Sequence, residues 1–411
     1  MDETNNFFPS SGTPKNLDTQ SIPLFPITFV VVNQNNLTGE VTTDTMDEFL
    51  DLLLRMHPIG KHTSQLRLQT YTTNLKLSNT GSGWSELLSE LDTVRNNDAG
   101  GSSQYYYGVV KVDYQQGVAG VGYIPSSANN SGFRTAIGWD YLTPASSGSY
   151  VLAHELGHNF GREHAPCGNV ADADPLWPKE SSYSNGKISA YGFDRVTKEL
   201  IPTTYFDLMG YCEPQWISDY TYKNVLAFRK KSSLGKTAGD NSERPQVWIW
   251  GRYDSGRFIL EPAFQTTMVP LPPEPGPYRL EGIDAQGQVV FFYDFQTTKV
   301  ADLLNHEHFS FSIDRPADYE RILTLRVRDD TGILAQQQGT AAIQLQPAKT
   351  HTVLQWHAES YPLVVIRDHT TGAILALARG GTTSFVATPG AQLTAVLSDG
   401  VQSETYAFTN P

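Results

Sequence analysis

The chain predicts a multidomain protein in which an α/β domain is followed by all-β, sandwich-like domains. Its 411 residues are too many for one ordinary hydrophobic core. Strand and helix patterns alternate over residues 25–233, whereas only short strands, separated by turn residues, follow the polar stretch at 236–242. With 39% hydrophobic and 18% charged residues, the composition excludes a disordered chain.

Changes in composition predict the domain boundaries. Residues 1–24 are rich in Asn, Ser, Thr and Pro, which is typical of a flexible segment. The α/β domain is expected over residues 25–235, a sandwich-like β domain over 245–346, and a small β domain over 347–411.

Within the α/β domain, hydrophobic periodicity predicts the elements in order. Apolar residues spaced three and four apart predict helices at 44–56, 82–96, 149–161 and 216–231, with Thr43 or Asp44 and Ser218 as N-caps. β-branched or alternating runs predict strands at 26–32, 65–77, 105–113 and 117–124.

Alternation of apolar and polar residues predicts the strands of the β domains. In the first β domain they are expected at 247–253, 257–262, 289–295, 309–313 and 322–327. In the second they are expected at 363–367, 374–378 and 392–397.

Charge and hydropathy exclude two classes of partner. The net charge of −13 is spread along the chain without a basic face, so we expect no nucleic-acid partner. The longest apolar run, near 27–32, is too short for a transmembrane segment. The first residues lack a signal-peptide pattern, so the protein is either cytosolic or has had its targeting segment removed.

Residues 154–164 carry the pattern that predicts chemistry, and they read His-Glu-Leu-Gly-His-Asn-Phe-Gly-Arg-Glu-His. His154 and His158 would project from one helix face, about 6 Å apart along its axis, close enough to share one metal ion. The carboxylate of Glu155 could reach a metal-bound water without being a ligand. Gly161 could adopt the left-handed conformation that ends the helix, and the returning chain would bring in His164 as third ligand.

This donor set predicts one catalytic Zn²⁺ ion. Three neutral imidazoles leave a fourth position open, which is typical of a catalytic zinc and not of a structural one. Five fixed positions make an accidental match rare, on the order of 10⁻⁵ for this composition. The alternative is a capped helix with surface histidines.

The motif resembles that of the metzincin clan of zinc metallopeptidases, and most of all the secreted, bacterial, reprolysin-like type, over roughly residues 25–233. Metzincins have a tight turn with a methionine beneath the zinc, and Met209 within residues 205–211 resembles this Met-turn. The alternative is that Met209 is an ordinary core residue. Ala165, which follows the third histidine, departs from the aspartate of reprolysin-like and the glutamate of astacin-like enzymes, so the subfamily stays open.

The resemblance also implies roles for a tyrosine and for the two cysteines. Tyr211, two residues after Met209, would be a catalytic residue that stabilises the oxyanion of the transition state, or else an aromatic packed beside Trp216. Cys167 and Cys212 would both lie near the floor of the zinc site. A disulfide between them would contribute about 4 kcal/mol, the alternatives being two reduced thiols or extra metal ligands.

The glycine-rich strand at 117–124 corresponds to the metzincin edge strand that lines the cleft and pairs with an extended substrate, unless it is a plain inner strand. Asp172 and Asp174 could join a Ca²⁺ site, although solvated turn residues are the more ordinary interpretation.

The sequence therefore predicts a zinc-dependent endopeptidase acting on protein or glycoprotein substrates, with Glu155 as general base. For a glycoprotein substrate, Trp177 and Tyr183 are where sugar contacts would be sought. The β domains are expected to bind carbohydrate or a surface. The alternative is a catalytically silent adhesion or binding protein on a metzincin frame. A disulfide favours a secreted or cell-surface protein whose signal segment has been removed.

Overall fold

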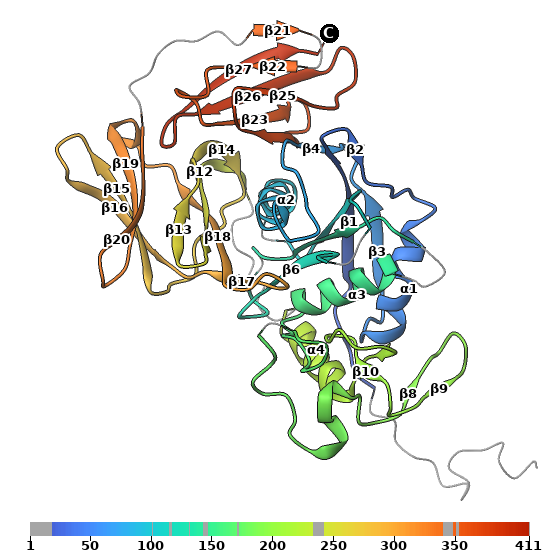
Figure 1. Cartoon of the computed structure of the whole chain (residues 1–411). Helices are drawn as coiled ribbons and strands as arrows, with labels where there is room; N and C mark the ends of the chain where they lie inside the picture. The colour runs from blue at the N-terminus through green and yellow to red at the C-terminus, as the bar shows by residue number, and fades with distance from the viewer. Residues whose placement is uncertain are drawn as a thin grey trace, which may run out of the picture.

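The computed structural model describes residues 19–100, 102–114, 117–130, 132–142, 147–170, 172–232, 242–339 and 353–410, with the backbone of residues 348–350. We call residues 19–232 the N-terminal region and residues 242–410 the C-terminal region. The α-helices of the described chain all belong to the N-terminal region, and strands dominate the rest (Figure 1). The described structure is thus mostly β-sheet with few helices.

A five-stranded sheet forms the centre of the N-terminal region. The strand order is β3 (His62–Leu66), β1 (Phe25–Gln34), β5 (Tyr105–Val110), β7 (Thr135–Trp139) and β6 (Gly120–Ile124). The first four strands are parallel, and β6 runs antiparallel to β7. Two short strands, β2 (Leu37–Thr38) and β4 (Tyr71–Thr73), pair with the last residues of β1.

Helices cover both faces of this sheet. Helix α2 (Trp84–Ala99) packs on one face, and α1 (Met46–Met56) and α3 (Ser147–Asn159) pack on the other. Successive residues of β1 show the division, because Val30 faces the α2 side and Phe29 faces α1 and α3. Helix α1 buries Phe49 and Leu53 completely, and each such side chain contributes roughly 2 kcal/mol of burial energy.

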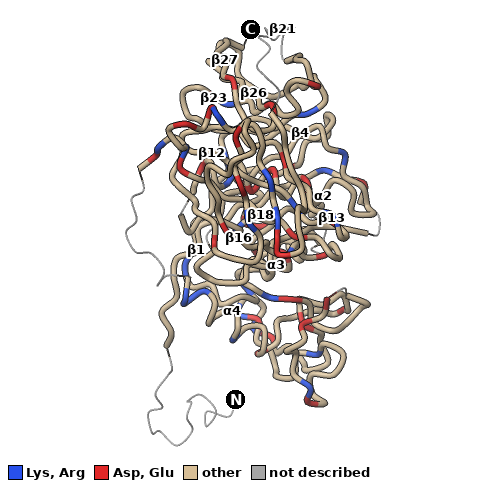
Figure 2. Tube along the Cα trace, turned by 90° about the vertical axis from the view of Figure 1, so that its left-hand side faces the viewer, with Lys and Arg blue, Asp and Glu red and all other residues tan. Residues whose placement is uncertain are grey.

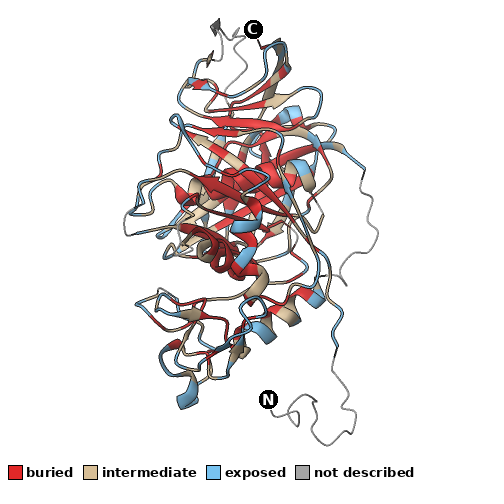
Figure 3. Ribbon diagram, turned by 90° about the vertical axis from the view of Figure 1, so that its right-hand side faces the viewer, coloured by how far each residue is buried: buried red, intermediate tan, exposed pale blue. Residues whose placement is uncertain are grey.

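The rest of the N-terminal region lies beneath α3 (Figure 1). It contains the 3₁₀ helix η2 (Ser181–Gly186), β8 (Gly192–Phe193), β9 (Leu200–Ile201), β10 (Phe206–Asp207), β11 (Gln215–Trp216) and α4 (Asp219–Lys231). This part is loop-rich and largely exposed, in contrast to the buried helices and sheet above it (Figure 3).

The first half of the C-terminal region forms two sheets around a shared apolar core. One sheet contains β12 (Arg244–Asp254), β13 (Arg257–Leu260), β14 (Phe264–Met268), β17 (Thr298–Val300) and β18 (His306–Asp314). The other contains β16 (Val289–Phe295), β15 (Tyr278–Asp284), β19 (Ile322–Arg328) and β20 (Ile333–Gln338), with the 3₁₀ helix η3 (Tyr319–Arg321) before β19. The core between them includes Val247, Leu280, Phe309 and Leu325.

The second half adds short and long strands with a core of their own. They are β21 (Ala348–Thr350), β22 (Val353–Gln355), β23 (Leu363–Asp368), β24 (Ile374–Ala378), β25 (Thr382–Ser384), β26 (Gln392–Ser398) and β27 (Ser403–Thr409). Strands β24, β23, β26 and β27 form consecutive antiparallel pairs.

Among the residues that the structure describes, strand pairing joins the two regions at two places. β17 pairs with β6, and β24 pairs with β4, so both C-terminal contacts extend sheets of the N-terminal region. Helix α2 lies between these contacts and shares one apolar core with Trp248, Trp250 and Leu363 (Figure 1). Basic and acidic residues are interspersed along the described trace (Figure 2).

Several element boundaries differ from the sequence predictions, because contacts with other segments decide where each element begins and ends. The predicted strand at 65–77 is two strands, because β3 pairs with the start of β1 and β4 with its end. Between them the chain leaves the sheet at Arg67, whose side chain pairs with Asp98. The predicted strand at 117–124 begins only at Gly120.

The helix termini also differ. Helix α1 has Thr45 as its N-cap, without a side-chain hydrogen bond, and so neither Thr43 nor Asp44 caps it. The predicted helix at 216–231 begins at Asp219, because Trp216 pairs in β11. Ser218 is the N-cap of α4 as predicted, and its side chain accepts a hydrogen bond from Thr221 N.

Candidate metal centre

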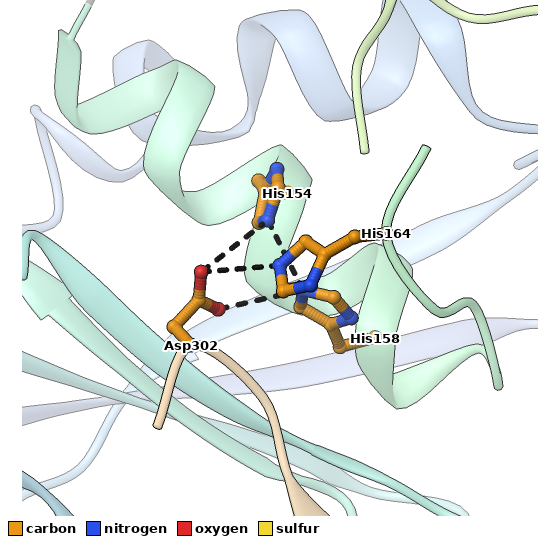
Figure 4. Close-up of side chains that lie close together, drawn as sticks. All are labelled: His154, His158, His164 and Asp302. Atoms are coloured by element: carbon orange, nitrogen blue, oxygen red, sulfur yellow. Dashed lines mark hydrogen bonds and ion pairs between the residues drawn. The ribbon is translucent and has the colours of Figure 1, made fainter. Parts of the chain in front are cut away.

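Helix α3 and the turn after it bring three histidines together. His154 and His158 lie one helical turn apart, with their Nε2 atoms 3.0 Å from each other. The helix ends at Asn159, and the backbone turns at Gly161, where φ is +75° and an added Cβ would lie 2.9 Å from Phe228. The returning chain places His164 against the other two imidazoles (Figure 4).

Backbone carbonyls fix the orientation of two of these rings. Nδ1–H of His154 donates to the carbonyl of Leu208 at 2.8 Å, and Nδ1–H of His158 donates to that of Arg162 at 2.6 Å. A carbonyl oxygen only accepts, so in neutral rings Nε2 carries the lone pair that faces the centre. Burial, followed by the neighbouring histidine, lowers the pKa of His154 to about 3, and burial also lowers the pKa of His158.

This arrangement fits a metal ion. Two Nε2 lone pairs 3.0 Å apart repel each other unless a cation lies between or beside them. The ligand atoms of His154, His158, His164 and Asp302 all lie within 4.8 Å of one another. Neutral imidazoles together with a carboxylate are a donor set that suits zinc.

Glu155 is buried beside the histidines. A Cβ on Gly120 of β6 would lie 2.8 Å from its Oε1 atom, so the glycine makes room for the carboxylate. Within the described chain, Oε2 of Glu155 has no hydrogen-bond partner. Burial, and secondly the charge of Asp302, raises the pKa of Glu155 well above its ordinary value.

The turn at Met209 supports the histidines from below. Met209 is fully buried, and a Cβ on Gly157 of α3 would lie 2.4 Å from its sulfur. Its N–H donates to Oδ1 of Asp207 at 2.8 Å, and its carbonyl accepts from Ala165 N at 3.0 Å. Gly157 and Asp207 were missed at the sequence level, although a glycine in the middle of an apolar helix is a detectable signal of close packing.

A disulfide joins Cys167 and Cys212, as the sequence predicts, with their Cα atoms 5.6 Å apart. The segments that contain the two cysteines are also joined by a hydrogen bond from Tyr211 N to the carbonyl of Cys167 at 3.0 Å. The disulfide therefore links the loop after His164 to the turn that contains Met209.

Tyr211 lies at the histidine cluster. Its hydroxyl is 3.2 Å from Nε2 of His164, and its ring centroid is 5.3 Å from that of His164. Burial, and secondly Asp302, raises its pKa, so the hydroxyl keeps its proton and can donate. That proton is directed at Oδ1 of Asp302 in this structure.

Asp302 is the member of the cluster that the sequence did not reveal. It follows β17 in the C-terminal region and points at the three imidazoles (Figure 4). Oδ1 lies 3.2 Å from Nε2 of His164 and 3.9 Å from Nε2 of His154, and Oδ2 lies 3.4 Å from Nε2 of His158. No local pattern marks this aspartate, because only the pairing of β17 with β6 brings it here.

A cleft of about 430 Å³ opens beside the cluster. Its lining includes Ala119 and Gly120, Val151 of α3, Glu155, Tyr211 and Asp302. The glycine-rich segment therefore does line the cleft, and β6 is the last strand of the N-terminal sheet before β17 joins it.

Two weaker predictions gain no support. Asp174 is engaged by Tyr220 and Leu176, and among the described residues the only His, Cys, Asp and Glu group able to hold an ion is the cluster around His154. Calcium at Asp172 and Asp174 is therefore unsupported. Trp177 is buried and donates to the carbonyl of Tyr183, so its ring face is not open to a sugar.

No helix in the described parts of the chain combines the length and apolar character needed to span a membrane.

Comparisons with known proteins agree with the motif. Residues 35–193 match the model of Metallo-peptidase family M12. This range includes all three histidines and Glu155, and the match supports a metzincin-type metallopeptidase. A search of curated proteins finds no match.

Among solved structures, the chain is similar to metalloproteinase-II from Bacteroides fragilis, with 15% identity and a TM-score of 0.28. The alignment covers 51% of this chain and 53% of that one, about half the length of each. A likeness this slight carries no weight for fold or function.

Proposed function

Because the N-terminal region carries a metzincin-type metallopeptidase match, we propose that the protein is a zinc-dependent endopeptidase acting on protein or glycoprotein substrates. The observation that supports this most is the convergence of three imidazoles beside a buried carboxylate at the edge of an open cleft. His154, His158 and His164 would hold the ion, which supplies Lewis-acid activation of water and of the scissile carbonyl.

The chain's own residues would perform the proton transfers. Glu155 accepts a proton from the attacking water and delivers it to the leaving amine. Burial raises its pKa, which makes the carboxylate a stronger base for the proton that it takes and returns. Tyr211 donates a hydrogen bond to the oxygen on which negative charge develops.

The remaining proposals concern the whole chain. We propose a peptidase domain at 25–235 and β domains at 245–346 and 347–411, while most of the predicted N-terminal segment at 1–24 lies outside the described residues. The β domains would bind carbohydrate or a surface. The disulfide supports a secreted or cell-surface protein, since such bonds persist in oxidising compartments.

A second candidate function has one observation in its favour. Four side chains converge on the centre, and a four-ligand metal site is typical of a structural ion. The chain would then be a catalytically silent binding protein on the same frame.

Cleavage of a mixed peptide library separates the two candidates. Asp302 contacts all three histidines, so its side chain is also varied in the test. Four proteins are compared at matched zinc content, namely the parent and Asp302→Asn, each with and without Glu155→Gln. Cleavage that disappears with Glu155→Gln supports the endopeptidase. Absence of cleavage from all four zinc-loaded proteins would favour the silent binding protein, and cleavage unaffected by Glu155→Gln would indicate a contaminant.

A further inference from the structure

The segment from Thr298 to Leu303, here called the crossing segment, runs across the metal centre in an extended form. Lys299 and Val300 pair antiparallel with Ile124 and Tyr123 of β6, and the N–H of Ala301 donates to the carbonyl of Gly122 at 2.8 Å. Farther along, Leu303 reaches Gly81, where an added Cβ would lie 2.9 Å from its side chain.

This backbone pairing occupies the end of the edge that an extended substrate would use, at Gly122, Tyr123 and Ile124. A peptide that binds by strand addition needs free N–H and carbonyl groups on the edge strand of a sheet. Along the end of β6, those groups already bond to the crossing segment. Val300 and Ala301 are buried there, so the crossing segment packs closely against the N-terminal region.

Asp302 completes the obstruction at the centre itself. Its two carboxylate oxygens lie 3.2 to 3.9 Å from the three Nε2 atoms, on the side where the histidines leave room for a fourth ligand. The hydroxyl of Tyr211, which would otherwise be free to bind an oxyanion, donates to Oδ1 of Asp302.

The cleft is divided at this point. Asp302 lines both the cleft of about 430 Å³ beside Glu155 and a separate cavity of about 230 Å³ beside Glu163 and Lys299. A substrate chain lying across the centre would have to pass through the crossing segment, and so it can bind only after the segment has moved.

We propose that Asp302 is a fourth ligand of the metal and that the crossing segment holds the substrate position, so that the chain is its own inhibitor. The ligand assignment stands on the geometry alone, whereas its regulatory consequence rests on the proposed function. Because the segment is tethered, its effective concentration is on the order of mM or more, which a dilute peptide substrate does not overcome.

The test measures access to the metal directly. Acetohydroxamate, a small bidentate metal ligand, is titrated by calorimetry into the zinc-loaded full-length protein and into zinc-loaded Asp302→Ala and Asp302→Asn. If the open form is about 1% of the parent population, the variants bind the hydroxamate about 100-fold more tightly. The visible spectrum of the cobalt-substituted proteins reports the same change in ligand number without any substrate.

One control and the second test variant separate this effect from general loosening or misfolding. Asp294→Asn removes a surface carboxylate of the C-terminal region that pairs with Arg279, and it is expected to leave hydroxamate affinity unchanged. Asp302→Asn retains the shape of the side chain, so it covers the case in which the alanine variant fails to fold.

The outcomes distinguish the two proposals. Equal hydroxamate affinity and equal cobalt spectra in the parent and both Asp302 variants would overturn the inhibitor. Tighter hydroxamate binding together with new peptide cleavage supports inhibitor and function alike. Tighter binding without cleavage by any variant supports the ligand role of Asp302 and counts against the endopeptidase.

Discussion

The C-terminal region meets the N-terminal region at two places that differ in chemistry. At β17 and β6, a short strand pair carries a carboxylate onto three imidazoles, and Val300 also packs into the apolar core around α2. Around α2, by contrast, the contact consists of that large apolar core together with the half-buried Arg379, which pairs with the buried Glu90 and Glu261. We infer that the α2 contact holds the regions together while the β17 contact controls the site.

The largest expected effect tests the catalytic side of this comparison. In the Asp302→Asn background, Glu155→Gln should lower peptide hydrolysis by about 10²- to 10⁴-fold, because a general base is lost. Zinc content and unfolding midpoint should match those of Asp302→Asn, and both are measured beside initial rates. Retention of more than about a tenth of the rate would remove Glu155 from its assigned role.

The next effect tests the α2 contact. Arg379→Met should lower the free energy of unfolding by about 3–5 kcal/mol, since it leaves Glu90, which is almost fully buried, without its guanidinium partner. Denaturant unfolding checks the value. Hydroxamate affinity of the folded variant should stay at the parent level, and a rise comparable to that of Asp302→Ala would show that the two contacts are not independent.

The same contact predicts a pH dependence. Asp92 of α2 is buried and accepts hydrogen bonds from Ser310 of β18 and from Thr135, and burial raises its pKa to about 7. In this state folding favours the protonated acid. The stabilisation of the folded state by Asp92 is therefore fully present below the unfolded pKa of about 4. It is lost as pH rises to about 7, and the free energy of unfolding falls by up to about 1.4 kcal/mol per pH unit.

Urea unfolding at pH 5, 6, 7 and 8 checks this. The free energy of unfolding of Asp92→Asn is expected to fall less steeply with pH than that of the parent over pH 5–7. Asp314→Asn, at an exposed ion pair, is the matched control and should follow the parent. Parallel curves for the parent and Asp92→Asn would contradict the assignment.

The smallest effect concerns the crossing segment. Nζ of Lys299 lies 2.9 Å from Oε1 of Glu163, and such a partly exposed ion pair contributes about 0.2–1 kcal/mol. Glu163→Gln should therefore raise hydroxamate affinity by no more than about fivefold. Lys299→Gln should raise hydroxamate affinity by a similar factor, and the double variant should raise it no further than either single variant. A double variant in which the two effects add would mean that this ion pair does not hold the crossing segment.

The sequence revealed those parts of the site that local spacing determines. His154 and His158 share a helix face, His164 follows a glycine turn, and the disulfide between Cys167 and Cys212 was found as predicted. The roles of Glu155, Met209 and Tyr211 stay predictions, although all three side chains lie where the site needs them.

Long-range pairing is what the sequence could not reveal. Asp302 lies in a turn between β17 and β18, in a stretch whose composition resembles any surface loop. Its position depends on the pairing of β17 with β6, which joins segments far apart in the chain. The split of the predicted strand at 65–77 has the same cause, because parallel partners along β1 decided where the strands end.

The placement of β17 on the same polypeptide as the histidines has a consequence for how the protein could be handled by a cell. Under the proposal made above, inhibitor and peptidase would be produced in a fixed ratio of one to one, and dilution could not separate them. Activation must then be an event on the chain itself, such as displacement of β17 by a surface or by a competing strand. A preparation that is inert when assayed at any concentration would thus be the expected behaviour of the intact molecule, and not a sign of a failed purification.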